Sequence, residues 1–233
     1  MTGEPVPAAG PPEHAMTLLP VGLVVGGRRC LVVGGGAVAA RKIRSLLVAG
    51  AWVTVVAPEV HEAVAYLASE GVLDHIDDHP LDLQLRPYRR GEAAHYRLVL
   101  AATGDPAVDG EVHADAEAAG IWVNSADDPE HCSVVLPAVH RDGAVTVAVA
   151  TGGASPALAS WIRDKVALAL GPGLGQLASL LAEGRRQVRD QGRSTSEVDW
   201  RRLLEGPFPD LVAAGQIEEA RQLMAAAIDS PLQ

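Results

Sequence analysis

The segment that most constrains the fold is a short apolar run followed at once by three glycines. The sequence Val32-Val33-Gly34-Gly35-Gly36-Ala37-Val38-Ala39 fits the pattern G-x-G-x-x-A. Residues 29–33 predict a buried strand, and residues 37–49 carry apolar side chains at helical spacing before Gly50. The chain is therefore predicted to form a strand, a tight glycine turn and a helix in direct succession.

Each small residue of this turn has a physical reason to be small. Gly34 permits the tight turn, Gly36 lets the backbone approach a pyrophosphate, and Ala39 keeps the helix close to the sheet. The free N–H groups and the dipole at the start of the helix attract negative charge. The pattern indicates a dinucleotide-binding loop, and the structural alternative is a glycine-rich turn without a ligand.

Strand and helix patterns alternate through the first half of the chain. They predict strands at 53–57, 83–88, 98–102 and 121–123, and helices at 59–70 and 106–119. Such alternation is typical of a doubly wound parallel sheet of the Rossmann type, within an α/β fold. Strands at 133–139 and 144–150, joined by a turn, and a helix at 155–170 come next, and the pattern from Leu174 is helical except for a polar loop at 190–196.

These changes of pattern divide the chain into four parts. We expect a disordered tail at 1–17, a nucleotide-binding domain at 18–136, a small α+β domain at 137–173 and a helical segment at 174–233. The tail has no basic start and no long apolar stretch, so it does not resemble a signal peptide.

The residues after the second predicted strand bear on the choice of dinucleotide. An acidic residue is expected there, about 20 residues after the glycines, to bind the ribose hydroxyls. Ala57 and Pro58 occupy the tip, and Glu59 is the nearest acid. Because no Arg or Lys stands at residues 57–61, we expect NAD rather than NADP. The alternative for Glu59 is a residue in the first turn of the next helix.

Charge and composition exclude several classes of partner. The net charge of -10 argues against nucleic acid and against an acidic membrane surface, and aromatic residues at 3% offer few stacking platforms for single strands. The two cysteines, Cys30 and Cys132, form no C-x-x-C pair, so we expect two reduced thiols in a cytoplasmic protein and no bound metal.

Three further stretches are candidates for function because they follow predicted strands. They are Leu100-Ala101-Ala102-Thr103-Gly104-Asp105-Pro106, Val123-Asn124-Ser125-Ala126-Asp127-Asp128-Pro129 and Thr151-Gly152-Gly153-Ala154-Ser155-Pro156. Ligands bind at the carboxyl ends of the strands in open α/β sheets. From residue types alone, however, Asp127 and Asp128 are turn residues before a proline, and Ser155-Pro156 is a helix start.

Five motifs occur in order along the chain: GGGAVAARK, VTVVAP, LAATGDP, VNSADDPEHCSVVLPA and TGGASPALA. Together they resemble the precorrin-2 dehydrogenase family, the dehydrogenase/ferrochelatase module of siroheme synthases. The resemblance runs from about Leu19 to about Leu170. It implies oxidation of precorrin-2 to sirohydrochlorin with NAD⁺, and in some members insertion of Fe²⁺ as a second substrate to give siroheme. It also implies a homodimer, with residues from about Pro137 to Leu170 as the dimerisation element.

The resemblance assigns roles to particular residues. It places the family's key aspartate at Asp127, and it places cofactor contacts on the glycine loop, Gly34 to Gly36 with Ala37 and Val38, and on the Pro58–Glu59 tip. Thr103, at the end of the fourth strand, is added to the cofactor set. A carboxylate beside the macrocycle is a sensible base, because the oxidation removes a hydride and a proton.

Several residues stay open between a functional and a structural role. His131 and His140 flank the Asp127 region and are acid, base or iron-ligand candidates, or ordinary surface histidines. Because the substrate carries many carboxylates, local cations must compensate for the negative protein; the candidates are Arg41, Lys42, Arg44, Arg141, Arg163 and Lys165. The alternative to an enzyme is a non-catalytic NAD-sensing module, which would explain the glycine loop but not VNSADDP or TGGASP.

Overall fold

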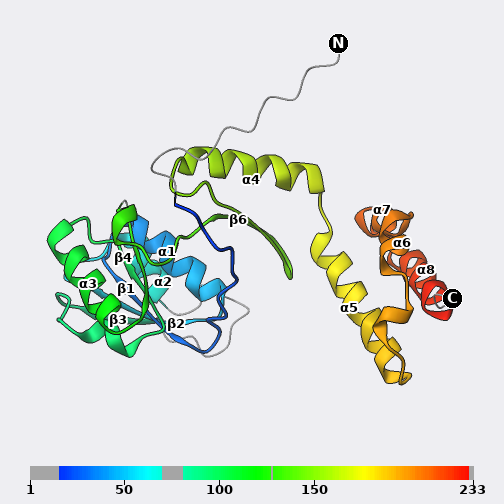
Figure 1. Ribbon diagram of the computed structural model, residues 1–233, viewed down its shortest axis with the longest axis horizontal. Helices are drawn as coiled ribbons and strands as arrows, with labels where there is room; N and C mark the ends of the chain where they lie inside the picture. The colour runs from blue at the N-terminus through cyan, green and yellow to red at the C-terminus, as the bar shows by residue number, and fades with distance from the viewer. Residues whose placement is uncertain (1–15, 70–80, 127, 231–233) are drawn as a thin grey trace, which may run out of the picture. The chain divides into compact units, whose positions relative to one another are not determined.

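The computed structural model describes residues 16–69, 81–126 and 128–230. The chain divides into two compact units, and the break falls between Leu136 and Pro137. The first unit holds Thr17–Leu136, and the second holds Met16 with the described residues from Pro137 onward. Figure 1 shows the elements of each unit along the chain.

The first unit is built on a five-stranded parallel sheet in the order β3-β2-β1-β4-β5. Its strands are β1 (Arg29–Val33), β2 (Trp52–Ala57), β3 (Leu81–Leu85), β4 (Leu98–Ala101) and β5 (Trp122–Ser125). Its helices are α1 (Ala37–Val48), α2 (Glu62–Ala68) and α3 (Pro106–Ala118), with short 3-10 helices η1 (Glu92–His95) and η2 (Pro129–His131). The predicted doubly wound parallel sheet is confirmed.

Both faces of this sheet are buried, and each has its own core. Cys30 and Val32 of β1 pack with Ile43 of α1 on one face. Leu31 and Val33, the alternate residues of the same strand, pack on the other face with side chains of α3 and η1. This alternation follows from the two-residue period of a strand. It explains why the strands read as continuous apolar runs, as parallel strands covered by helices do.

Local signals fix the ends of the helices. Asp105 accepts hydrogen bonds from the first backbone N–H groups of α3, Pro106 occupies the first helical position, and Gly120 follows the helix with a φ of 66°. These are a side-chain cap, an N-terminal proline and a C-terminal glycine in their preferred places. The bounds of α1 and α3 therefore lie within a residue of those predicted from the sequence.

Two predicted strands lie elsewhere than expected. The strand predicted at 83–88 is β3 at Leu81–Leu85, since Pro87 has no N–H to continue a ladder. The strand predicted from Ser133 begins only at Ala138. The backbone N–H groups of Ser133 and Val134 instead donate to the Val123 carbonyl, which ties this segment to the end of β5.

The second unit begins with an antiparallel hairpin of β6 (Ala138–Asp142) and β7 (Val145–Val149). The helices that follow are α4 (Pro156–Leu170), α5 (Leu174–Asp190), α6 (Trp200–Glu205), α7 (Phe208–Ala213) and α8 (Ile217–Asp229), with the 3-10 helix η3 (Thr195–Glu197). Helices α5 to α8 share a core in which Leu180, Phe208 and Met224 are fully buried. The hairpin turn touches the start of α5 so closely that a Cβ on Gly143 would meet the Gly175 Cα at 2.7 Å.

Among the described residues, no single helix combines the length and apolar character needed to cross a membrane. Helices α4 and α5 meet the length and composition test only as a pair, and they are bent by 61° at their junction.

Candidate functional site

The glycine loop joins β1 to α1 at the point where the sheet order reverses. Gly34 has a φ of 122°, and a Cβ there would lie 2.2 Å from the Ala102 carbonyl oxygen after β4. A Cβ on Gly35 would lie 2.1 Å from the Glu59 carbonyl oxygen. These two glycines are therefore needed so that the loop can pack between the segments that follow β4 and β2.

Gly36, unlike Gly34 and Gly35, is not crowded by neighbouring backbone. A Cβ on Gly36 would meet no atom within 4 Å, and Gly36 and Ala37 are exposed. Gly36 is the N-cap of α1, no side chain of the described chain caps it by a hydrogen bond, and the first turn of α1 holds no acidic residue. Its position leaves the positive end of α1 open to an anion such as a pyrophosphate. Ala39, fully buried, keeps α1 against the sheet.

The tip of β2 differs from the sequence expectation. The helix predicted from Glu59 begins only at Glu62, and His61 is its N-cap, accepting a hydrogen bond from the Ala63 N–H. The intervening link is held by the His61 N–H, which donates to the Gly35 carbonyl at 2.8 Å. Pro58 and Glu59 are exposed in this link. The alternative that placed Glu59 in the first turn of a helix is therefore wrong.

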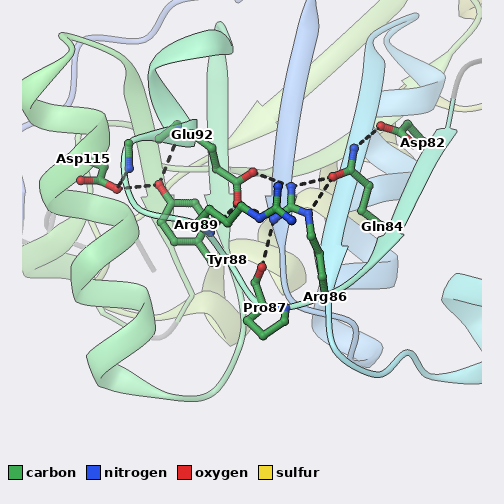
Figure 2. A network of polar contacts seen from close by, with 10 residues as sticks. Asp82, Gln84, Arg86, Pro87, Tyr88, Arg89, Glu92 and Asp115 are labelled. Carbon is green, nitrogen blue, oxygen red and sulfur yellow. Dashed lines mark hydrogen bonds and ion pairs between the residues drawn. The ribbon is translucent and has the colours of Figure 1, made fainter.

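A polar network beside this tip holds the segment after β3 (Figure 2). Arg86 follows β3, and its backbone N–H donates to the Ala57 carbonyl. Its guanidinium donates to both carboxylate oxygens of Glu92, the nearer at 2.6 Å, and to Gln84. Figure 2 also shows the Tyr88 hydroxyl donating to Asp115 of α3. Arg86 is thus a basic residue bonded to the end of β2, and Glu92 and Gln84 already accept hydrogen bonds from its guanidinium.

Thr103, predicted to contact the cofactor, lies in the loop between β4 and α3. Its hydroxyl donates to the Asp109 carboxylate at 2.7 Å and accepts from the Asp105 N–H. The Thr103 N–H also donates to Asp109, whose side chain is buried. Asp109 is not among the residues predicted from the sequence. Its signal was an acid in the first turn of the helix that follows the LAATGDP motif.

The VNSADDP segment continues β5 and carries the predicted key aspartate. Asp127 lies outside the described residues, while its neighbours on both sides are described. Asn124 is buried; its amide oxygen accepts from the Lys42 ammonium of α1 at 2.5 Å, and its amide nitrogen donates to the Val134 carbonyl. Lys42, predicted from the sequence only as one of several candidate cations for the substrate's carboxylates, thus joins the glycine-loop helix to this segment.

A thiol closes the same segment into a compact loop. The Cys132 sulfur accepts from the Ser125 N–H and lies 3.2 Å from the Asp128 carbonyl, to which the thiol can donate. Burial raises the pKa of this thiol, and neighbouring hydrogen bonds only partly offset the effect. Cys132 is therefore a neutral donor and acceptor that fixes the two ends of the loop.

Three titratable side chains gather beside this loop. The His131 Nδ1 lies 2.6 Å from an Asp128 carboxylate oxygen, and this hydrogen bond lowers the pKa of Asp128. The His113 ring, from α3, packs edge-on against the His131 ring with centroids 4.8 Å apart. The His113 Nδ1 and the Ser125 hydroxyl are buried without a hydrogen-bond partner among the described residues. The sequence offers His131 as a candidate because it lies close to Asp127, whereas His113 carries no such signal.

The remaining candidates lie on other surfaces. Arg41 and Arg44 are exposed on α1. In the second unit, Ser155 caps α4 by accepting from the Leu158 N–H, as its sequence predicts. Arg163 pairs with Asp164, and Lys165 lies over the Trp161 ring. Within the described part of the chain, no group of three or more His, Cys, Asp or Glu side chains is placed to hold a metal ion.

Comparison with protein families gives three consecutive matches. A family described as putative NAD(P)-binding matches residues 21–138, which is half of the chain. The sirohaem biosynthesis protein central region matches 142–167, and the sirohaem synthase dimerisation region matches 173–228. These matches and the open glycine loop define the class: this is an NAD(P)-binding α/β protein with the accessory regions of sirohaem synthases.

The solved structure of SirC, a precorrin-2 dehydrogenase, is similar in fold, with a TM-score of 0.68 and 25% identity over 91% of this chain and 100% of that one. The siroheme synthases of Nitrosococcus oceani and Pseudomonas putida are 35% and 38% identical over 92% and 94% of this chain. The chain belongs to the family described as putative NAD(P)-binding, whose model matches half of it. It spans about half the length of these curated relatives, 44% and 46% respectively.

Proposed function

We propose that this chain oxidises precorrin-2 to sirohydrochlorin with NAD⁺ as the hydride acceptor. One observation carries the proposal: a glycine loop with an open helix start stands at the switch point of a sheet whose edge strand β5 bears the VN-x-x-D motif at its end. The similarity to SirC over that protein's whole length supports the same activity. Bound NAD supplies the oxidant, and the chain supplies its binding and the proton acceptor.

The cofactor would lie along the segments described above. The α1 start, with Gly36, Ala37 and Val38, is proposed to hold the pyrophosphate, and Pro58 and Glu59 the adenosine ribose. The guanidinium of Arg86 is occupied by Glu92, which supports NAD over NADP because a 2′-phosphate needs a cation with unused donors. Thr103 is proposed to contact the cofactor at the end of β4, where Asp105 and Asp109 hold it in place through its hydroxyl and its N–H.

Asp127 is proposed to take the proton that leaves the substrate as the hydride departs. Anaerobic incubation with precorrin-2 and NAD⁺, followed at the absorbance of NADH and of sirohydrochlorin, tests this with Asp127→Ala in parallel. We expect turnover by the natural chain and a loss of at least about a hundredfold in the variant, the usual contribution of a general base. NAD⁺ binding without any NADH would contradict the dehydrogenase and favour the NAD-sensing alternative.

Adding Fe²⁺ to the same reaction tests metal insertion. The relatives named siroheme synthase motivate this second activity, in which Fe²⁺ would be a substrate. Conversion of the sirohydrochlorin spectrum to that of siroheme, dependent on the protein, is the expected result if the chain is bifunctional.

We further propose a cytoplasmic homodimer. Helix α4 exposes Leu158, Trp161 and Leu168, which a partner subunit would cover, and the dimerisation-region family matches 173–228. The dimer interface would then include residues 137–173, the element expected from the sequence, together with the helical segment 174–233. The two cysteines are free thiols, as suits a reducing compartment. Light scattering at several protein concentrations tests the dimer.

A further inference from the structure

We propose that Glu92 selects NAD over NADP by occupying the guanidinium of Arg86, the arginine that would otherwise bind the 2′-phosphate of NADP. The inference rests on the proposed function, because it concerns the same cofactor. Structurally it rests on the place of Arg86 beside the tip of β2 and on the five hydrogen bonds that its guanidinium donates (Figure 2).

Arg86 lies next to the place where a dinucleotide-binding sheet contacts the adenosine ribose. Its backbone N–H donates to the carbonyl of Ala57, the last residue of β2, at 3.0 Å. Neighbouring strands lie about 4.8 Å apart, so the backbone of Arg86 is one strand spacing from the tip that Pro58 and Glu59 form. The side chain of Arg86 is longer than this spacing. An arginine near the tip is the residue that accommodates the 2′-phosphate in NADP-binding sheets.

The five N–H donors of the Arg86 guanidinium are all used inside the protein. Two donate to the amide oxygen of Gln84, from Nε and from one terminal nitrogen, and one donates to the Pro87 carbonyl. The other two, one from each terminal nitrogen, donate to the two carboxylate oxygens of Glu92 at 3.0 and 2.6 Å. Arg86 therefore has no donor left for a phosphate while Glu92 is in place.

Glu92 is the charged one among these three partners of Arg86. Its carboxylate takes a parallel pair of donors, which is also the geometry in which arginine binds a phosphate. The hydrogen bond to Glu92 raises the pKa of Arg86, and both groups are charged at neutral pH. The side chains of Arg86 and Glu92 are only 20% and 14% exposed, so salt screens their attraction little. The pair is therefore neutral as a whole beside the tip of β2.

Removal of Glu92 leaves Arg86 charged, with two parallel donors free. Gln84 and Pro87 still hold the guanidinium beside the β2 tip. A 2′-phosphate can then take the pair of donors that Glu92 leaves. With Glu92 present, the same phosphate meets a neutral pair without free donors and is repelled by the carboxylate. Glu92 is thus a positioning residue that sets the cofactor preference through Arg86.

The test is calorimetric titration of the full chain and its variants with NAD⁺ and with NADP⁺, so the readout is binding and not turnover. The natural chain should bind NAD⁺ more tightly than NADP⁺. Glu92→Ala should gain about tenfold or more in affinity for NADP⁺, the usual effect of charged hydrogen bonds, with its affinity for NAD⁺ unchanged. Glu92→Gln keeps a neutral acceptor, should shift the preference in the same direction, and replaces the alanine variant if that one does not fold. Glu117→Gln removes the same charge from the exposed surface of α3 and, as the matched control, should change neither affinity.

The double variant Arg86→Gln with Glu92→Ala shows whether Arg86 is the cation that binds the phosphate. It should lose the gain in NADP⁺ affinity, which a mere loosening of the loop by the Glu92 substitution would not predict. A gain that survives in the double variant, or no gain in either Glu92 variant, would overturn the inference. A natural chain that binds NADP⁺ as tightly as NAD⁺ would also overturn it, while leaving the proposed dehydrogenase intact. A natural chain that binds neither dinucleotide would overturn the proposed function itself.

Discussion

The Lys42 ammonium of α1 and the Asn124 amide oxygen of β5 lie 2.5 Å apart, although 82 positions separate them in the chain. The contact links the second turn of the glycine-loop helix to the first residue after Val123, where the VN-x-x-D motif continues. Because Asn124 is buried, its oxygen depends on this donor.

Replacing Lys42 with Met should destabilise the first unit by about 1–3 kcal/mol, the cost of leaving a buried acceptor unpaired. Urea unfolding measures the change. In a double-mutant cycle, the cost of the Lys42 substitution should fall once Asn124 is replaced by Leu, so the two changes should be non-additive. Simple addition of the two effects would show that the contact contributes no coupling energy.

Gly34 and Gly36 should respond differently to the same substitution. Gly34→Ala places a Cβ 2.2 Å from the Ala102 carbonyl at a φ of 122°, so we expect a loss of several kcal/mol in stability or no folded protein. Gly36→Ala meets nothing within 4 Å and should leave the melting temperature unchanged. It should weaken NAD binding about tenfold or more, since the methyl group occupies the space of the pyrophosphate. Calorimetric titration with NAD⁺ checks the second expectation, and unchanged affinity would place the pyrophosphate elsewhere.

The Arg86–Glu92 pair should make part of the stability pH-dependent. Burial alone raises the pKa of Glu92, but the hydrogen bonds from Arg86 and the Arg89 N–H outweigh it and leave the pKa lowered. A lowered pKa in the folded state stabilises the fold above the unfolded value, near 4.3, and this stabilisation is lost as the pH falls through the lower folded value. Glu92→Gln should therefore cost about 2 kcal/mol at pH 7 and progressively less in acid. Glu117→Gln, on the exposed surface of α3, is the control.

The two cysteines should resist thiol reagents in the folded protein. Burial raises the pKa of Cys30 to about 11, and the side chain has no exposed surface. Cys132 is half-buried, and burial raises its pKa too. Titration with a disulfide reagent at pH 8 should label Cys132 slowly and Cys30 not at all, and both at once in guanidinium. Rapid labelling of Cys30 in native protein would contradict the buried position.

The sequence predicts the nucleotide-binding unit well because its signals are local. Gly34 to Gly36, the Asp105-Pro106 helix start and the apolar strands each act through neighbours in the chain. The contacts that assemble the site are not local: Lys42 with Asn124, and His113 with His131, join residues from separate elements. No spacing in the sequence encodes these pairs, so His113 could not be found by pattern. The start of the strand predicted from Ser133 was wrong for the same reason, since the N–H groups of Ser133 and Val134 bond to the Val123 carbonyl.

The sheet of the first unit separates two sets of side chains that alternate along each strand. Val32 and Val33 are adjacent in the chain, yet they belong to different clusters on opposite faces. Mutations at such neighbours should therefore add in their effects on folding, while mutations distant in sequence but within one cluster should couple. Natural variation can then accumulate on one face without compensating changes on the other. A variant library for this protein is best built one face at a time.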